Sequence, residues 1–271
     1  DSYIYNIKDG ADAQAIWIWN GGAHYKFVNN FLEATGENFL TGGTDPKIAN
    51  AVPSHIEFRR NHLFKRLAWR DVANSWTIKN LFELKNSQYH LVTGNVMENS
   101  WLDGQDGTAI LFTVRNQEGT AAWSRVRDVD LRNNKILNVG NIASCVAEDD
   151  RVGYPSETTE RILMDNNLGF VTADALTSSP RFLAFGSIDD ARPAKWFTLT
   201  RNTFLVLDGG EESVPFQHLH FNSAFVCVDN FLCQNNIMIH GSYNPNWPRT
   251  TNSTHDHNVI VINPLDSRGS F

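Results

Sequence analysis

The sequence predicts an all-β protein in which one strand–corner–strand unit is stacked as a solenoid. The first of three observations behind this prediction is a repeat. Seven asparagines each follow mostly apolar residues by five and three positions and, with one glycine as the exception, precede another apolar residue by two. They are spaced by 31, 34, 39, 33, 35 and 34 residues: Asn30, Asn61, Asn95, Asn134, Asn167, Asn202 and Asn236. A period of this length is typical of a supersecondary unit that buries its apolar face on its neighbours.

The second observation is the period of two before each asparagine. The positions five and three residues before it are mostly apolar, whereas the position two residues before it is often polar, as at Arg59, Thr93 and Thr200. Side chains that alternate between inside and outside in this way are typical of a β-strand.

The third observation is a break in that alternation. The asparagine comes three residues after the last apolar position, and the residue before it is usually Asn or Gly, types that tolerate a left-handed backbone. We therefore expect a sharp two-residue corner, with buried asparagines hydrogen-bonded amide to amide along the stack. Equivalent second strands are expected at residues 80–85, 109–115, 142–148, 182–187 and 224–229.

This pattern resembles the right-handed parallel β-helix of the pectate-lyase-like superfamily, in which an asparagine ladder at a tight corner is a familiar feature. Residues 9–15, 99–109 and 112–117 also resemble a group of poorly characterised bacterial β-helix proteins. The resemblance implies a right-handed parallel β-helix of about seven to eight rungs, formed as a single domain by residues 1–271. A sandwich or propeller is the alternative fold, but it would need hairpin turns that punctuate the repeat.

The first residues, 1–7, read like the second half of a rung. We therefore expect a fragment that lacks its N-terminal cap, since an open end exposes strand edges. A preceding domain or an assembly partner is expected at that end.

Composition narrows the range of partners. A net charge of −7 and a pI near 5.7 give no general attraction to nucleic acid or to an anionic membrane. No apolar run approaches the roughly 20 residues that insertion into a membrane requires. The three cysteines form neither a disulfide framework nor a zinc pattern, and we expect them to be small buried apolar residues.

Charged residues and one asparagine gather at the ends of the second strands. Residues at equivalent places in successive rungs lie about 4.8 Å apart, so these side chains are expected to border a groove, with solvated strand ends as the alternative. They are Asp45, Glu83, Lys85, Arg115, Asn116, Glu148, Asp149, Asp150, Asp189, Asp190 and Asp229. A glycosidase needs two carboxylates about 5 to 9.5 Å apart, and a lyase needs cations beside a base. Glu83, Lys85, Arg115 and Asp149 are the catalytic candidates in this group.

The loop at residues 98–107 adds two further catalytic candidates. Gly104 and Gly107 suggest a tight loop that exposes Asp103 and Asp106 beside Trp101. Such a loop could bind Ca²⁺, although it lacks the spacing of an EF-hand, and a glycine-rich corner capped by Asp is the alternative. No metal ligands are assigned.

Eight tryptophans are many for this length, and those in loops could stack on sugar rings. The expected substrate-binding residues are Trp69, Trp101, Trp123 and Asn116, with packing in the core or at its rim as the alternative for the tryptophans. The sequence thus predicts a secreted, periplasmic or cell-surface β-helix that acts on a polysaccharide as a lyase or a glycoside hydrolase. The alternative is a non-catalytic surface, adhesive or structural β-helix that binds glycans or assembles with partners.

Overall fold

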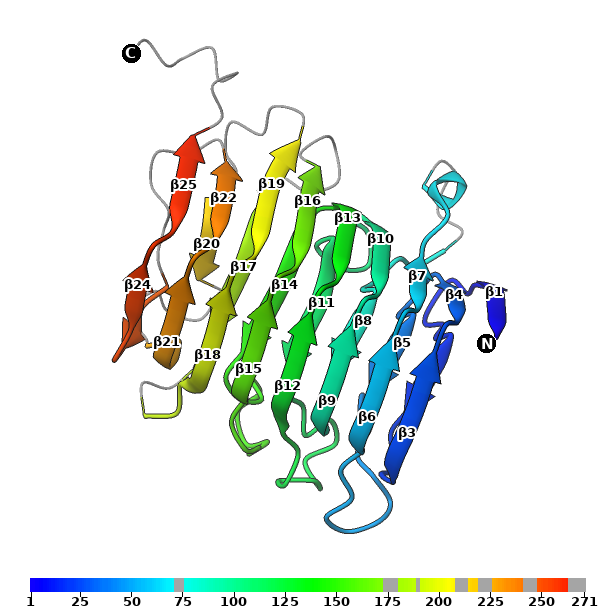
Figure 1. The fold of residues 1–271 in the computed structure, drawn as a ribbon. Coiled ribbons are helices and arrows are strands. Elements are labelled where there is room, and N and C mark those ends of the chain that lie inside the picture. Colours follow the sequence, from blue (N-terminus) through cyan, green and yellow to red (C-terminus); the bar gives the residue numbers. More distant parts are fainter. Residues whose placement is uncertain are drawn as a thin grey trace.

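The computed structural model describes residues 1–70, 76–172, 180–188, 191–207, 214–218, 226–240 and 248–262. The chain winds as a parallel β-helix in which three strands make one turn, and each strand pairs in parallel with those one turn away (Figure 1). Three sheets therefore run along the stack. This confirms the predicted fold class.

The three sheets are named here A, B and C. Sheet A contains β1 (Tyr3–Ile7), β4 (Phe31–Ala34), β7 (His62–Phe64), β10 (Val96–Ser100), β13 (Lys135–Val139), β16 (Leu168–Thr172), β19 (Thr203–Leu207), β22 (Ile237–His240) and β25 (Val259–Ile262). Sheet B contains β2 (Ile16–Ile18), β5 (Phe39–Thr41), β8 (Phe82–Leu84), β11 (Thr108–Thr113), β14 (Asn141–Val146), β17 (Arg181–Gly186) and β20 (Val214–His218). Sheet C contains β3 (Ala23–Val28), β6 (Ser54–Arg59), β9 (Ser87–Thr93), β12 (Val126–Arg132), β15 (Glu160–Asp165), β18 (Ala194–Thr200), β21 (Val228–Gln234) and β23 (Thr250–Thr251), with β24 (Thr254–Asp256) also paired to β21.

The strands of sheet C precede the repeated asparagines, and their register follows the sequence repeat. Ile56, His90 and Val129 are direct partners across β6, β9 and β12, and each lies five residues before its asparagine. From the second repeat onward, the positions five and three residues before and two after the asparagine are buried. The predicted inward columns are therefore confirmed.

The asparagine ladder satisfies every amide group of its interior members, as Asn134 illustrates. Its Oδ1 accepts hydrogen bonds from the backbone N–H of Asn95 at 3.0 Å and from Asn95 Nδ2 at 2.9 Å. Its Nδ2 donates to the Val92 carbonyl at 3.0 Å and to Asn167 Oδ1 at 3.0 Å. An amide side chain has two donor hydrogens and an oxygen with two lone pairs, so burial leaves none of them unpaired.

The ladder has an eighth member that the seven-fold repeat did not include. Asn258 Oδ1 accepts a hydrogen bond from Asn236 Nδ2 at 2.9 Å, and Asn258 Nδ2 donates to the Cys233 carbonyl at 2.7 Å. Asn258 follows Asn236 by 22 residues, and Ser253 and His255 occupy the usual apolar positions before it. The shorter spacing and the polar residues concealed it.

The sharp corner is also confirmed. The residue before each ladder asparagine has a positive φ. This includes Arg60 at 53° and Arg201 at 55°, although arginine, unlike Asn or Gly, rarely adopts this conformation. One predicted strand was wrong, because within residues 224–229 only Val228 and Asp229 lie in a described strand, and that strand is β21 of sheet C. The sheet B strand of this turn is β20, and residues 224–225 lie outside the described part.

Gly169 is the exception among the buried residues two positions after the asparagine. A Cβ at this position would lie 2.6 Å from the Ile142 side chain and 2.8 Å from that of Phe204. The core at this level is filled by these neighbours, so a larger residue would have to displace them. The three cysteines are free and buried, as expected. In the described part of the chain, no helix is long and apolar enough to cross a membrane.

Candidate functional site

The sequence-predicted site residues do not form one constellation. Lys85, Arg115, Asn116 and Asp149 follow the carboxyl ends of the sheet B strands, whereas Asp103 and Asp106 lie in the connection that leads into sheet B. Glu83 lies within β8, between the two ends.

The residues at the carboxyl ends of sheet B do meet. The backbone N–H of Arg115 donates to the Lys85 carbonyl at 2.9 Å, so these residues lie on adjacent rungs as expected. The Arg115 guanidinium pairs with Asp150 at 2.8 Å and lies 3.8 Å from Asp149. Asp149 Oδ2 accepts the backbone N–H of Asn116 at 2.7 Å, and Asp149 Oδ1 accepts that of Arg151 at 3.0 Å. Because the Asp149 side chain has no exposed area, its carboxylate organises this loop from within.

Asn116 is buried and makes hydrogen bonds within the same group of loops. Its Nδ2 donates to the Pro155 carbonyl at 2.8 Å, and its Oδ1 accepts the backbone N–H of Ala121 at 2.7 Å. Beside this loop is a hollow of about 400 Å³, in which Glu148 pairs with Arg192 at 2.8 Å. The Arg151 guanidinium lies 4.4 Å from the centre of the Tyr154 ring. The charged side chains that line this hollow are thus engaged in contacts with neighbouring residues of the protein.

Glu83 is 1% exposed, although its position in β8 faces outward. Its two carboxylate oxygens meet Lys85 Nζ at 3.2 Å and Asn80 Nδ2 at 2.9 Å. This is a nearly closed ion pair with limited access to a ligand.

The two aspartates of the loop between β10 and β11 are held mainly by contacts with other rungs. Asp103 Oδ1 accepts the backbone N–H of Ile78 at 3.1 Å, and Asp106 pairs with Arg181 and accepts the Thr108 hydroxyl at 3.2 Å. Trp101 is 3% exposed and packs with Trp69 and Ile78 in a small separate cluster.

Trp123 is half-buried, and its indole N–H donates to the Ala51 carbonyl at 3.2 Å. Asp189 and Asp190 of the predicted charged edge lie outside the described residues, and Asp229 lies in sheet C instead. Among the described residues, no group of three or more His, Cys, Asp or Glu is placed to hold a metal ion.

A second series of residues with a left-handed backbone conformation runs along the outward side of sheet C. Each lies six positions before a ladder asparagine, and φ ranges from 48° to 64°: His24, His55, Tyr89, Asp128, Arg161, Trp196, Asn230 and Asn252. The strand pairing keeps the same register on both sides of these residues, as at Arg127 and Val129, so each is a left-handed kink without an inserted residue, and the word bulge is used here in that sense. Asn252 lies between β23 and β24. We call these eight residues the bulge column.

The bulge column forms a contact chain across several strands. The His24 and His55 rings lie 4.9 Å apart between centroids, and the His55 and Tyr89 rings also lie 4.9 Å apart. Arg161 pairs with both oxygens of Asp128, at 2.6 and 3.0 Å, and lies 5.9 Å from the Trp196 ring centre. The Asp128 hydrogen bonds raise the pKa of Arg161 above its ordinary value.

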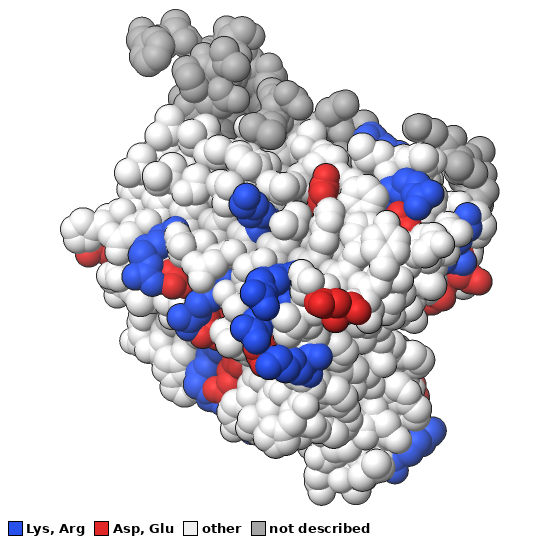
Figure 2. All heavy atoms as spheres, turned by 45° about the vertical axis from the view of Figure 1, so that its right-hand side comes forward, with Lys and Arg blue, Asp and Glu red and all other residues white. Residues whose placement is uncertain are grey.

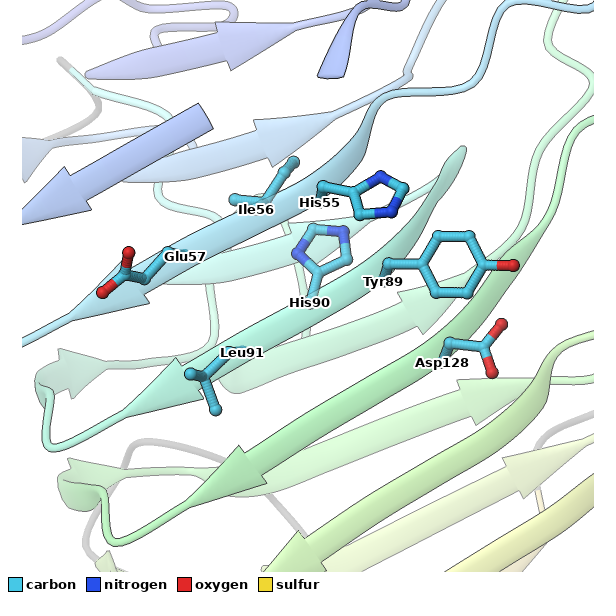
Figure 3. A pocket seen from close by; sticks show the side chains of 7 residues that line it. All are labelled: His55, Ile56, Glu57, Tyr89, His90, Leu91 and Asp128. Carbon is cyan, nitrogen blue, oxygen red and sulfur yellow. The ribbon is translucent and has the colours of Figure 1, made fainter. Parts of the chain in front are cut away.

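A shallow hollow of about 350 Å³ lies at the centre of this face (Figure 3). It is lined by His55, Ile56, Glu57, Tyr89, His90, Leu91 and Asp128. Tyr89 is 43% exposed, so its ring can receive a flat ligand. His90 is almost fully buried, and burial lowers its pKa to about 3.

Both carboxylates at this hollow are paired with cations that lie away from its centre. Glu57 pairs with Arg59 on its own strand and with Lys26 at 3.4 Å on the neighbouring strand, whereas Asp128 pairs with Arg161 on the other side. Figure 2 likewise shows positive and negative side chains close together on the face it presents. The site thus offers aromatic rings and hydrogen-bonding groups with its charges compensated.

The bulge column was not predicted, although a constant offset of six residues from each asparagine could have revealed it. It shares no residue type, since it contains His, Tyr, Asp, Arg, Trp and Asn. Its members share a left-handed backbone conformation. Bulky side chains rarely adopt this conformation, so the residue types in the column give no sign of it.

The fold and the site together define a parallel β-helix with an aromatic and polar flank. Comparisons with known protein families, with curated proteins and with solved structures found no match to this chain.

Proposed function

We propose that this chain is a pectate-lyase-like β-helix that binds a linear polysaccharide lengthwise on the outward face of sheet C. The observation that carries the proposal is the bulge column, which presents exposed aromatic and hydrogen-bonding side chains on consecutive rungs. Tyr89 and Trp196 are 43% and 47% exposed, so both rings are accessible on this face. The C–H faces of sugars pack on such rings, and their hydroxyls pair with the neighbouring polar groups.

The spacing of the rungs favours a polymer over a small ligand. Successive members of the column are about 4.8 Å apart, comparable to the length of one sugar unit, so a chain crossing the strands meets a new side chain at each step. Tyr89 and Trp196 lie three rungs apart, which is about 14 Å. A ligand that reaches both must contain several sugars. An extracellular location is proposed because polysaccharides of this kind lie outside cells.

Binding without cleavage fits the central hollow best. Glu57 and Asp128 lie on strands two rungs apart, about 10 Å, and each pairs with a cation on its far side. By register Glu57 is aligned with Leu91 and Asp130, so Asp128 is also offset by two residues along the strand, which places the two carboxylates beyond the range that glycosidases use. Each ion pair also draws its carboxylate away from the space between them.

Cleavage by lyase or hydrolase chemistry is the second candidate. It is favoured by the grouping of Lys85, Arg115 and Asp149 at the carboxyl ends of sheet B, with Glu83 ion-paired to Lys85. In that proposal Lys85 and Arg115 would neutralise a uronate carboxylate while an acidic side chain moves the proton. The loop would have to open first, because the Asp149 carboxylate is enclosed.

A panel of soluble polysaccharides tests both candidates. Affinity electrophoresis measures binding, while reducing ends and the absorbance of new double bonds measure cleavage. We expect retardation by at least one linear polysaccharide without turnover, and weaker binding when the oligosaccharide is too short to span Tyr89 and Trp196. No retardation and no turnover on any polymer would refute the proposal, and turnover that Arg115→Ala abolishes would favour the second candidate.

A further inference from the structure

We infer that the ligand of sheet C is a neutral polysaccharide, and that recognition is concentrated on the uncharged strand β9; this inference rests on the proposed function. It is supported by the distribution of charged residues over the strands of sheet C, which is independent of the bulge column.

The charges on the first seven strands of sheet C balance. The strands β3, β6, β9, β12, β15, β18 and β21 carry six cationic and six anionic residues: Lys26, Arg59, Arg127, Arg132, Arg161 and Lys195 against Glu57, Asp128, Asp130, Glu160, Asp165 and Asp229. An ion pair or a hydrogen bond engages each of the anions, for example Arg132 with Asp130 and Arg201 with Asp165. Within the described residues, five of the six cations are ion-paired in turn, all but Lys195, so a polyanion approaching this face would have to separate existing pairs.

Among these seven strands, β9 alone carries no Lys, Arg, Asp or Glu. It lies between β6, which bears Glu57, and β12, which bears Asp128, and it supplies Tyr89, His90 and Leu91 to the hollow. The middle strand of this hollow is therefore uncharged, and the charged groups Glu57 and Asp128 stand at its two sides (Figure 3).

His90 takes no part in this recognition. It is 3% exposed and occupies the inward column with Ile56 and Val129, so its ring lies beneath the strand and cannot be reached by a ligand on the outward face. The outward side chains of β9 are Tyr89 and Leu91, which are 43% and 39% exposed. A neutral sugar can pack its C–H face on these two side chains without meeting a charge on the same strand.

The chain itself supplies the variants for the test. Asn230 and Asn252 occupy the bulge column with the same left-handed backbone, so Tyr89→Asn and Trp196→Asn remove the rings without straining the strand. Ile237→Thr serves as the matched control, because Ile237 is an exposed side chain on sheet A and its partner Thr203 holds the equivalent position.

The experiment compares a neutral glucan, mannan and xylan with polygalacturonate and alginate by isothermal titration. It is carried out between about 0.01 and 1 M salt, over which the screening length falls from about 30 to 3 Å. We expect a neutral polymer to bind with an affinity that salt hardly changes. We expect Tyr89→Asn to weaken binding about tenfold, Trp196→Asn to weaken it severalfold, and Ile237→Thr to leave it unchanged.

The possible failures are distinguishable. Binding to polyuronates only, with an affinity that falls steeply as salt rises, would overturn the neutral ligand but leave the proposed function standing. Neutral binding that survives Tyr89→Asn would overturn the role of β9, whatever the effect of Trp196→Asn. Absence of binding to every polymer would remove the proposed function and this inference together.

Discussion

The outward faces of sheets A and C differ sharply, although the same alternation builds both. Sheet C presents balanced charges and exposed rings. The outward positions of β16, β19, β22 and β25 on sheet A are mostly apolar, with Thr172 and Thr203 as exceptions: Leu168, Phe170, Leu205, Ile237, Ile239, Val259 and Val261. Alternation determines which side chains fill the core and places no demand on those that point outward. The surface is therefore where two sheets of one solenoid acquire different properties, and the asparagine corner is the boundary between them.

Removing that corner should have the largest effect. In Asn134→Ala the backbone N–H and Nδ2 of Asn95 and the Val92 carbonyl lose their partner in a buried site. We expect the free energy of unfolding to fall by about 4 kcal/mol, since each unsatisfied buried group costs about 1–3 kcal/mol. Urea unfolding measures it, with the exposed neighbour Lys135→Ala as a control that should stay within about 0.5 kcal/mol. Equal effects of the two substitutions would mean that the ladder does not define the boundary.

The next effect is acid sensitivity beneath sheet C. Burial lowers the pKa of His90 to about 3, below the ordinary 6.5, so between these values the unfolded chain binds more protons than the folded one. Stability should therefore be lost as the pH falls through this range, by about 3 kcal/mol between pH 7 and pH 4. His90→Val, which copies Val129 of the same column, should remove this component from unfolding curves measured at each pH. Parallel wild-type and variant curves would contradict the buried neutral histidine.

A buried lysine at the end of a sheet A strand should act in a different pH window. Lys65 has no exposed area, its Nζ donates to the carbonyls of Ala34 at 2.9 Å, Thr35 at 3.0 Å and Gly36, and burial lowers its pKa to about 7. The unfolded chain, with a pKa near 10.5, binds more protons between these values, so stability should rise with pH, by about 2 kcal/mol from pH 7 to pH 9. Lys65→Met should be less stable at pH 9 and should lack the slope. If the slope persists in the variant, or is absent from the wild type, the ammonium stays charged on its three carbonyls.

The smallest effect concerns the apolar face itself. Ile237→Thr combined with Val259→Thr should change the free energy of unfolding by no more than about 0.5 kcal/mol for each substitution, because both side chains are well exposed. The double variant should elute earlier from a hydrophobic-interaction column, whereas Tyr89→Asn should alter glycan binding more than this retention. If Tyr89→Asn reduced column retention as much as the double variant does, the proposed difference between the outward faces of sheets A and C would be contradicted.

The asparagine repeat was sufficient to predict the stacked rungs, because each ladder amide must find the next one and each inward column must match its neighbour in register. The repeat did not reveal Asn258, because its spacing from Asn236 is shorter than usual and the residues before it are polar. The site was harder to predict from the sequence. Arg115, Asn116 and Asp149 do lie together, as expected. The enclosed state of Asp149, however, depends on hydrogen bonds from loop backbone, and no local sequence pattern specifies the path of that loop.

The amino-acid sequence by itself determined the strand periodicity and the corner, which depend on residues a few positions apart, and the order in which rungs stack, which the repeat of 31 to 39 residues specifies. The tertiary structure alone decided which outward side chains become neighbours. His24, His55 and Tyr89 are 31 and 34 residues apart, and a left-handed bulge in each strand brings their rings into one stack. A backbone conformation shared by unlike residues, and contacts made between turns, leave no signature in any single segment.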